Sequence, residues 1–136
     1  MNFFRSLKKK PTTPFKAIGG QVITNAIAET FYDIMEGDPL AADLMAIHPK
    51  PLTRIREVFA LYLTMWLGGP NTYEEQFGHP RLRARHLPFT VTPVLKEQWM
   101  YCMRKAIFKH VPDKTLANRI LASLNELAEH MINTKD

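Results

Sequence analysis

The sequence predicts an all-α fold, and three observations support this prediction. Apolar residues recur at helical spacing in four long segments. Pro, Gly and capping residues stand at the ends of these segments, and no segment alternates apolar and polar residues as a half-buried strand would. A chain of 136 residues has the length of one domain and can bury a substantial core. We therefore expect a basic N-terminal extension over residues 1–13 and one helical domain over residues 14–136.

Two long helices are expected in the first half of the domain. The first follows Gly19-Gly20 and ends at Gly37, with apolar residues at Val22, Ile23, Ala26, Ile27, Phe31 and Ile34. Asp38-Pro39 then supplies an N-cap and a first helical residue for a short helix. The second long helix spans residues 52–67 and ends at Gly68-Gly69-Pro70; its apolar residues are Ile55, Val58, Phe59, Tyr62, Leu63 and Trp66.

Residues 71–91 show no clean period and are polar, aromatic and basic. If Pro80 begins a short helix there, His86 lies near its end, with Leu82 and Arg83 one turn back and His79 two turns back. An irregular stretch of about 20 residues inside a compact domain is uncommon and is usually functional. We therefore expect the functional residues to centre on this segment.

Two more long helices are expected after residue 91. Thr92-Pro93 begins the third by the same capping pattern, and Pro112 limits it. Its inward stripe consists of Leu95, Trp99, Cys102, Met103, Ala106, Ile107 and His110. The fourth follows Asp113 and directs inward Leu116, Ile120, Leu124, Leu127 and Met131. Cys102 falls on a buried stripe, which favours an inert packing role over a reactive thiol.

Composition predicts an ordinary cytoplasmic protein. Hydrophobic residues make up 46% of the chain and charged residues 23%. No apolar run approaches the roughly 18–20 residues that span a bilayer, and residues 1–10 lack the pattern of a signal peptide. A single cysteine excludes a disulfide within the chain.

The net charge of +5 is concentrated in the N-terminal extension. Removing Arg5, Lys8, Lys9 and Lys10 from the 18 basic residues leaves 14 against 13 acidic residues. A nearly neutral body argues against nucleic-acid binding, which needs a basic face on the fold itself. The extension is either a solvated tail or a short amphipathic segment with weak affinity for an anionic membrane surface.

Taken alone, His86 reads as an ordinary histidine on a surface helix among arginines. The residues around His86 do not have the spacing of zinc ligands, and no Ser/His/Asp or Cys/His arrangement for nucleophilic catalysis is evident. The sequence around His86 is more informative than the histidine alone. It reads Gly68-Gly-Pro-Asn-Thr-Tyr and then Gln76-Phe-Gly-His-Pro-Arg-Leu-Arg-Ala-Arg-His86-Leu-Pro-Phe. Together with Phe31-Tyr32, His48-Pro49 and Trp99, these motifs resemble group II truncated haemoglobins over about residues 14–131.

The resemblance implies a globin-like, truncated two-over-two helical sandwich around haem b, with His86 as the proximal iron ligand. A neutral imidazole suits this role, and its second nitrogen should donate to a backbone carbonyl. The implied distal donors are Tyr32, His48 and Trp99; Ile55 occupies the gate position on the following helix and cannot donate. Phe59 is a further apolar residue of the implied distal side. The remaining candidates would contact the cofactor, the polar ones its propionates and the apolar ones its faces: Tyr73, His79, Arg83, Arg85, Phe89 and Leu63.

The resemblance also implies reversible, tight binding of dioxygen and of other diatomic ligands such as CO and NO. An unidentified reductase would then return ferric iron to the ferrous state. The same distal donors would serve a peroxidase-like or nitric-oxide-detoxifying enzyme, or a haem-based redox or ligand sensor, so these alternatives stay open. A haem-free helical interaction module is a further alternative, and the setting of His86 and Trp99 speaks against it.

Overall fold

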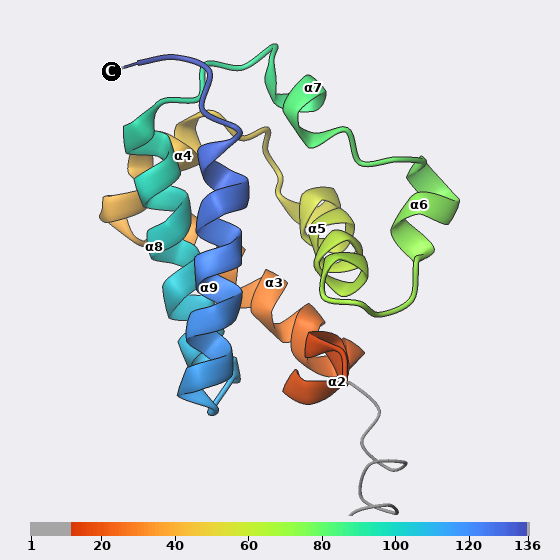
Figure 1. The fold of residues 1–136 in the computed structure, drawn as a ribbon. Helices are drawn as coiled ribbons and strands as arrows, with labels where there is room; N and C mark the ends of the chain where they lie inside the picture. The colour runs from red at the N-terminus through yellow and green to blue at the C-terminus, as the bar shows by residue number, and fades with distance from the viewer. Residues whose placement is uncertain (1–11, 136) are drawn as a thin grey trace, which may run out of the picture.

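All secondary-structure elements in the described part of the chain, residues 12–135, are helical, as predicted (Figure 1). The structure is a computed structural model. Its elements are α2 (Pro14–Ile18), α3 (Gln21–Gly37), the 3-10 helix η1 (Pro39–Ala41), α4 (Ala42–Ala46), α5 (Thr53–Trp66), α6 (Thr72–Phe77), α7 (Leu82–His86), α8 (Pro93–His110) and α9 (Lys114–Glu129). The predicted membrane-surface contact of the basic tail lies outside the described residues.

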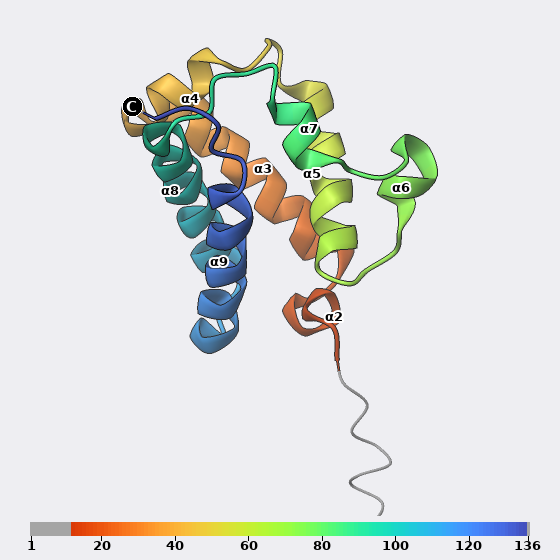
Figure 2. The same ribbon diagram turned by 45° about the horizontal axis from the view of Figure 1, so that its top comes forward.

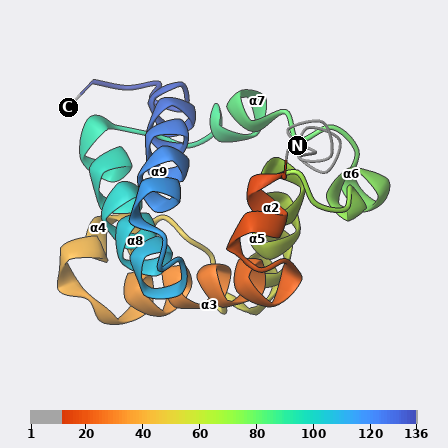
Figure 3. The ribbon, with the colours of Figure 1, turned by 60° about the horizontal axis from the view of Figure 1, so that its bottom comes forward.

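Four long helices form two packed pairs, which confirms the two-over-two arrangement. Helix α3 packs against α5 on one side and against α8 on the other, and α8 packs against α9. Figure 3 shows α8 and α9 side by side in one group, α2 and α5 in another, and α3 crossing both. The short helices α6 and α7 connect α5 to α8 along the outside of this core (Figure 2).

The N-caps are those expected from the sequence. The side chain of Thr92 accepts the Leu95 N–H at 3.2 Å, and that of Asp113 accepts the Leu116 N–H at 3.1 Å. Asp38 likewise accepts an N–H at the start of η1, 3.0 Å from Oδ1. Each cap pairs a donor that the first turn of a helix would otherwise leave free.

The segment 71–91 is more helical than predicted. It contains α6, whose six residues are too few to show an apolar period. Helix α7 begins at Leu82, not at Pro80, because Arg81 adopts a left-handed conformation with φ of 45°. His79 therefore lies outside the helix, where its Nδ1 accepts the Arg81 N–H at 3.1 Å.

The Gly68-Gly69 pair that ends α5 also provides room for the unpredicted helix α2. A Cβ atom at Gly69 would lie 2.7 Å from the Phe15 ring, and one at Gly68 would lie 2.9 Å from the Thr13 side chain. The Phe15 N–H donates to the Leu67 carbonyl across this contact at 2.8 Å. Glycine is thus needed here for close approach as well as for the turn.

The core lies where α3 crosses α5 and α8, and it includes Phe31, Leu63 and Met103. Cys102 is fully buried there, as predicted, and burial raises the pKa of its thiol to about 11. A protonated, buried thiol is a packing group at neutral pH. Among the described residues, no helix is long and apolar enough to cross a membrane.

Candidate functional site

A cavity of about 440 Å³ lies among α3, α5, α7, α8 and α9. This volume falls within the range of about 300–1,000 Å³ that is typical of small-molecule and cofactor sites. Most of the wall is apolar, and the polar groups come from a few side chains. The lining residues are Tyr32, Leu44, Ile47, His48, Pro49, Ile55, Val58, Phe59, Tyr62, Tyr73, Leu82, Arg85, His86, Phe89, Val91, Leu95, Lys96, Trp99, Leu127, Ala128 and Met131.

His86 lines this cavity from the end of α7. Its Nδ1–H donates to the carbonyl oxygen of Leu82 at 2.6 Å, one turn back on the same helix. In the neutral ring, this hydrogen bond places the proton on Nδ1 and leaves the lone pair on Nε2. His86 can therefore offer one oriented nitrogen to an electrophilic centre in the cavity.

Aromatic side chains from three other helices form another part of the wall. Tyr32 of α3 and Phe59 of α5 have ring centroids 5.7 Å apart, and Phe59 lies 6.3 Å from Trp99 of α8. Phe31 supports this group from the core, 4.8 Å from Tyr32 and 5.6 Å from Trp99. Packing on several sides fixes the positions of the hydroxyl of Tyr32 and the indole N–H of Trp99.

The hydroxyl of Tyr32 is a donor at physiological pH. The residue is 4% exposed, and burial raises its pKa well above the ordinary value, opposed in part by the charge of Arg56. Within residues 12–135, neither this hydroxyl nor the Trp99 indole N–H forms a hydrogen bond with another residue. Both donors line the cavity and are free to bond a guest in it.

His48 adds a third polar group to the wall. It follows α4, and its Nδ1–H donates to the carbonyl oxygen of Leu44 at 2.8 Å. Its ring lies 6.1 Å from that of Tyr32, nearly perpendicular to it. The second nitrogen, Nε2, therefore remains available close to the Tyr32 side of the cavity.

The other predicted contacts divide into two groups. Tyr73, Arg85, Phe89, Phe59 and Ile55 line the cavity, whereas Leu63, His79 and Arg83 do not. Leu63 is 1% exposed in the core, and the guanidinium of Arg83 donates to the carbonyl oxygen of His130 at 2.8 Å.

Sequence reasoning missed Lys96, which lines the cavity one turn before Trp99 on α8. Its ammonium lies 3.3 Å from a carboxylate oxygen of Glu97 and 3.4 Å from one of Glu129. The spacing of three residues from Trp99 was the available signal, because residues i and i+3 share a helix face.

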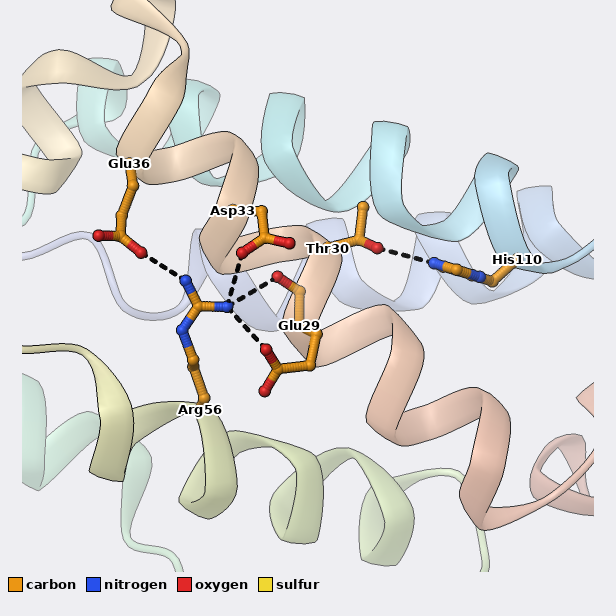
Figure 4. Close-up of polar contacts among 6 residues, drawn as sticks. All are labelled: Glu29, Thr30, Asp33, Glu36, Arg56 and His110. Carbon is orange, nitrogen blue, oxygen red and sulfur yellow. Dashed lines mark hydrogen bonds and ion pairs between the residues drawn. The ribbon is translucent and has the colours of Figure 1, made fainter.

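Helix α3, which provides Tyr32, packs against α8, and a half-buried polar contact joins the two helices. The Nε2 of His110 and the hydroxyl of Thr30 are 2.7 Å apart (Figure 4). Burial, and to a smaller extent the charge of Lys109, lowers the pKa of His110. The ring is therefore neutral at pH 7, and the contact is an ordinary hydrogen bond between α3 and α8.

Arg56 fixes α3 from the α5 side (Figure 4). Its guanidinium contacts Glu36, lies 2.9 Å from Glu29 Oε2 and 2.8 Å from Asp33 Oδ1, and stands 5.9 Å from the Tyr32 ring centroid. Burial lowers the pKa of Arg56, but its hydrogen bonds to Asp33 and Glu36 outweigh this effect and raise the pKa above its ordinary value. The guanidinium of Arg56 thus binds three carboxylates of α3 close to the Tyr32 ring.

Replacing Arg56 with methionine should lower the free energy of unfolding by about 1–2 kcal/mol, because three carboxylates would face one another without a cation. The carboxylate side chains are 50–68% exposed, which limits the effect. Urea unfolding of the variant and of Arg119→Met, an exposed position on α9, measures it. A difference that persists unchanged in 1 M salt would contradict an ionic origin.

The wall of the cavity fits a flat, largely apolar cofactor with a metal at its centre. Ile47 is 42% exposed and Phe89 is 53% exposed, yet both line the cavity, so a guest there would cover them. No group of three or more His, Cys, Asp or Glu residues in the described range could hold a metal ion. A single histidine would suffice as the protein ligand of a haem iron, because the porphyrin supplies the remaining nitrogen ligands.

Comparison with known proteins identifies the family. The model of the bacterial-like globin family matches residues 13–133. The chain belongs to the bacterial-like globins. Globins are haem proteins that bind diatomic gases, so haem and ligand binding follow from membership.

Similar structures place the chain among the truncated haemoglobins of this family. The cold-adapted truncated haemoglobin of Pseudoalteromonas haloplanktis is 46% identical, with a TM-score of 0.89, 90% of this chain covered and 99% of that one. The group II two-on-two haemoglobin of Agrobacterium tumefaciens is 36% identical, with a TM-score of 0.90 and coverage of 95% and 99%. Both confirm the predicted fold, and the group II protein from A. tumefaciens confirms the group predicted from the motifs around His86.

Bacillus subtilis provides a further relative. Its group 2 truncated haemoglobin is 36% identical over 120 residues, 88% of each chain. A solved structure described as a truncated oxygen-avid haemoglobin from this organism is 34% identical, with a TM-score of 0.81 and coverage of 90% and 100%.

Proposed function

We propose that this globin holds haem b through His86 and binds dioxygen, as well as CO and NO, with high affinity. The observation that supports this proposal is the position of His86, whose Nε2 is free and whose Nδ1 is bonded in the wall of the cavity that also contains Tyr32 and Trp99. When bound, the haem iron supplies the coordination site for a diatomic ligand.

On the proximal side, this chain's residues would orient and anchor the cofactor. The Leu82 carbonyl fixes the His86 ring and makes its Nε2 a better donor to the metal. Arg85, Tyr73 and Lys96 line the cavity and are the proposed partners of the haem propionates. Phe89 would cover an apolar face of the macrocycle.

On the distal side, Tyr32 and Trp99 would donate hydrogen bonds to a bound ligand. The predicted donor role of His48 does not fit its geometry, because its Nδ1–H is bonded to the Leu44 carbonyl and its neutral ring then offers Nε2 as an acceptor. Hydrogen bonds to a group with charge contribute about 1.5–3 kcal/mol each, and about 1.4 kcal/mol changes an equilibrium tenfold. Ile55 and Phe59 add apolar surface that excludes water. Two such donors would make dioxygen release slow, in keeping with the oxygen-avid relative from B. subtilis.

A second candidate function is haem enzyme chemistry, either peroxidase-like turnover or nitric-oxide detoxification. It is favoured by the same convergence of Tyr32 and Trp99 on one cavity, since donors that hold a charged ligand also stabilise charge in a reaction. Either function needs an electron donor, and a reductase would supply it. Stopped-flow mixing of the dioxygen complex with nitric oxide, and peroxide turnover, would distinguish enzyme from carrier.

Titration of the purified protein with hemin should reach saturation at one haem per chain. After reduction, the absorption spectrum should be that of a five-coordinate ferrous haem, and CO should convert it to a histidine-ligated CO complex. Bovine serum albumin, which binds hemin without a globin fold, serves as the control. A protein that yields neither a ferrous-CO nor a dioxygen spectrum would overturn the proposal.

A further inference from the structure

The residues that follow α9 fold back onto the segment that links His86 to α8. The side-chain amide of Asn133 donates to the carbonyl oxygens of His86 at 3.2 Å and Phe89 at 2.9 Å. Its Oδ1 accepts the Val91 N–H at 2.9 Å, and its own backbone N–H donates to the Val91 carbonyl at 3.0 Å. One side chain thus bonds three residues of the linking segment.

This bonding matters because α7 has little stability of its own. The helix has five residues, whereas isolated helices shorter than about 12–15 residues are marginal in water. The following segment includes Pro88, which has no N–H to donate. The position of His86 therefore depends on contacts from outside its own helix.

A second contact holds the same two segments together. Arg83 of α7 donates to the carbonyl oxygen of His130, the residue that ends α9. Asn133 itself is only partly exposed, and its amide is the group that reaches the His86 carbonyl. The end of α9 and the proximal helix are thereby joined at two points.

We propose that Asn133 is a positioning residue for the iron ligand: by bonding the His86 and Phe89 carbonyls it sets the orientation of His86 and the strength of its bond to iron. The inference rests on the proposed role of His86. Asn133 does not contact the cavity; it acts through the backbone that bears the ligand.

The decisive variant is Asn133→Asp, which keeps an acceptor for the Val91 N–H but replaces the amide donor by a carboxylate facing two carbonyl oxygens. Asn125→Asp makes the same change of charge at an exposed position on α9 and is the matched control. Asn133→Ala is the second variant; it removes both donors without adding charge. Circular dichroism establishes that each variant is folded.

Resonance Raman spectroscopy of the haem-loaded ferrous protein measures the iron–histidine stretching band. We expect this band to shift and broaden in Asn133→Asp and, to a smaller extent, in Asn133→Ala, and to stay unchanged in Asn125→Asp. Transfer of hemin to excess apomyoglobin should accelerate about tenfold or more in both Asn133 variants, since two hydrogen bonds to the ligand segment are lost.

Amide hydrogen exchange of the haem-loaded protein provides a readout without spectroscopy of the iron. Exchange at Val91 should accelerate about tenfold in Asn133→Ala, because its acceptor is removed. An iron–histidine band and hemin transfer rates that match wild type in the folded Asn133 variants would overturn the inference. A wild-type protein without such a band would overturn the proposed role of His86 instead.

Discussion

Replacing His86 with alanine should leave a folded protein that no longer retains haem. The cavity would lose the imidazole that α7 orients toward it, and only contacts with the macrocycle and its propionates would hold the cofactor. Removing a residue that hydrogen-bonds a metal ligand typically lowers the affinity for the metal about 10–100-fold. Removal of the ligand itself should therefore raise the hemin transfer rate by more than about a hundredfold. Transfer to apomyoglobin and the reduced absorption spectrum measure the loss.

His130→Ala is the control for this experiment, because its side chain is exposed at the end of α9 and only its backbone carbonyl bonds α7. Added imidazole should restore a ligated ferrous spectrum in His86→Ala by entering the space that the ring vacates. An unchanged spectrum in the variant without imidazole would show that another residue binds the iron.

Tyr32→Phe and Trp99→Leu should each accelerate dioxygen release by about ten- to a hundredfold, which corresponds to about 1.5–3 kcal/mol per donor. Each change removes a donor N–H or O–H from the cavity wall while keeping apolar volume there. Displacement of dioxygen by excess CO in a stopped-flow instrument measures the rate.

Tyr62→Phe is the matched control, since it removes a hydroxyl from a different part of the same cavity wall. The factor by which Tyr32→Phe accelerates release should be the same at every pH between 6 and 9, because the raised pKa of Tyr32 keeps its hydroxyl protonated throughout. Equal release rates in wild type and in both variants would remove Tyr32 and Trp99 from the set of donors.

The features that were predicted from sequence depend on short-range chemistry. Thr92 and Asp113 begin helices because their side chains accept an N–H three residues ahead, a relation that the sequence shows directly. The long helices have clear apolar periods, and the spacing around His86 is specific to the group. Local pattern was therefore enough for the four main helices and for the motifs that identify the family.

The features that were missed depend on contacts between distant residues or on single backbone angles. The left-handed conformation of Arg81, which delays the start of α7, has no signal in residue type, because non-glycine residues rarely adopt it. Arg83 seemed suited to a propionate, yet its guanidinium bonds a carbonyl 47 positions away. Asn133 was not predicted as a site residue, because no pattern near it in the sequence indicates a contact with His86.

The bonds between Asn133 and the ligand segment join residues 47 positions apart, and this order matters while the chain is made. During translation α7 emerges well before the residues that hold it, so the ligand segment passes through a period without its partner. Closing so long a loop follows the packing of α8 against α9, which brings residue 133 into place. We expect a nascent chain that does not yet include residue 133 to present His86 on a loosely held helix, so that haem binding by a firmly held histidine follows the synthesis of residue 133.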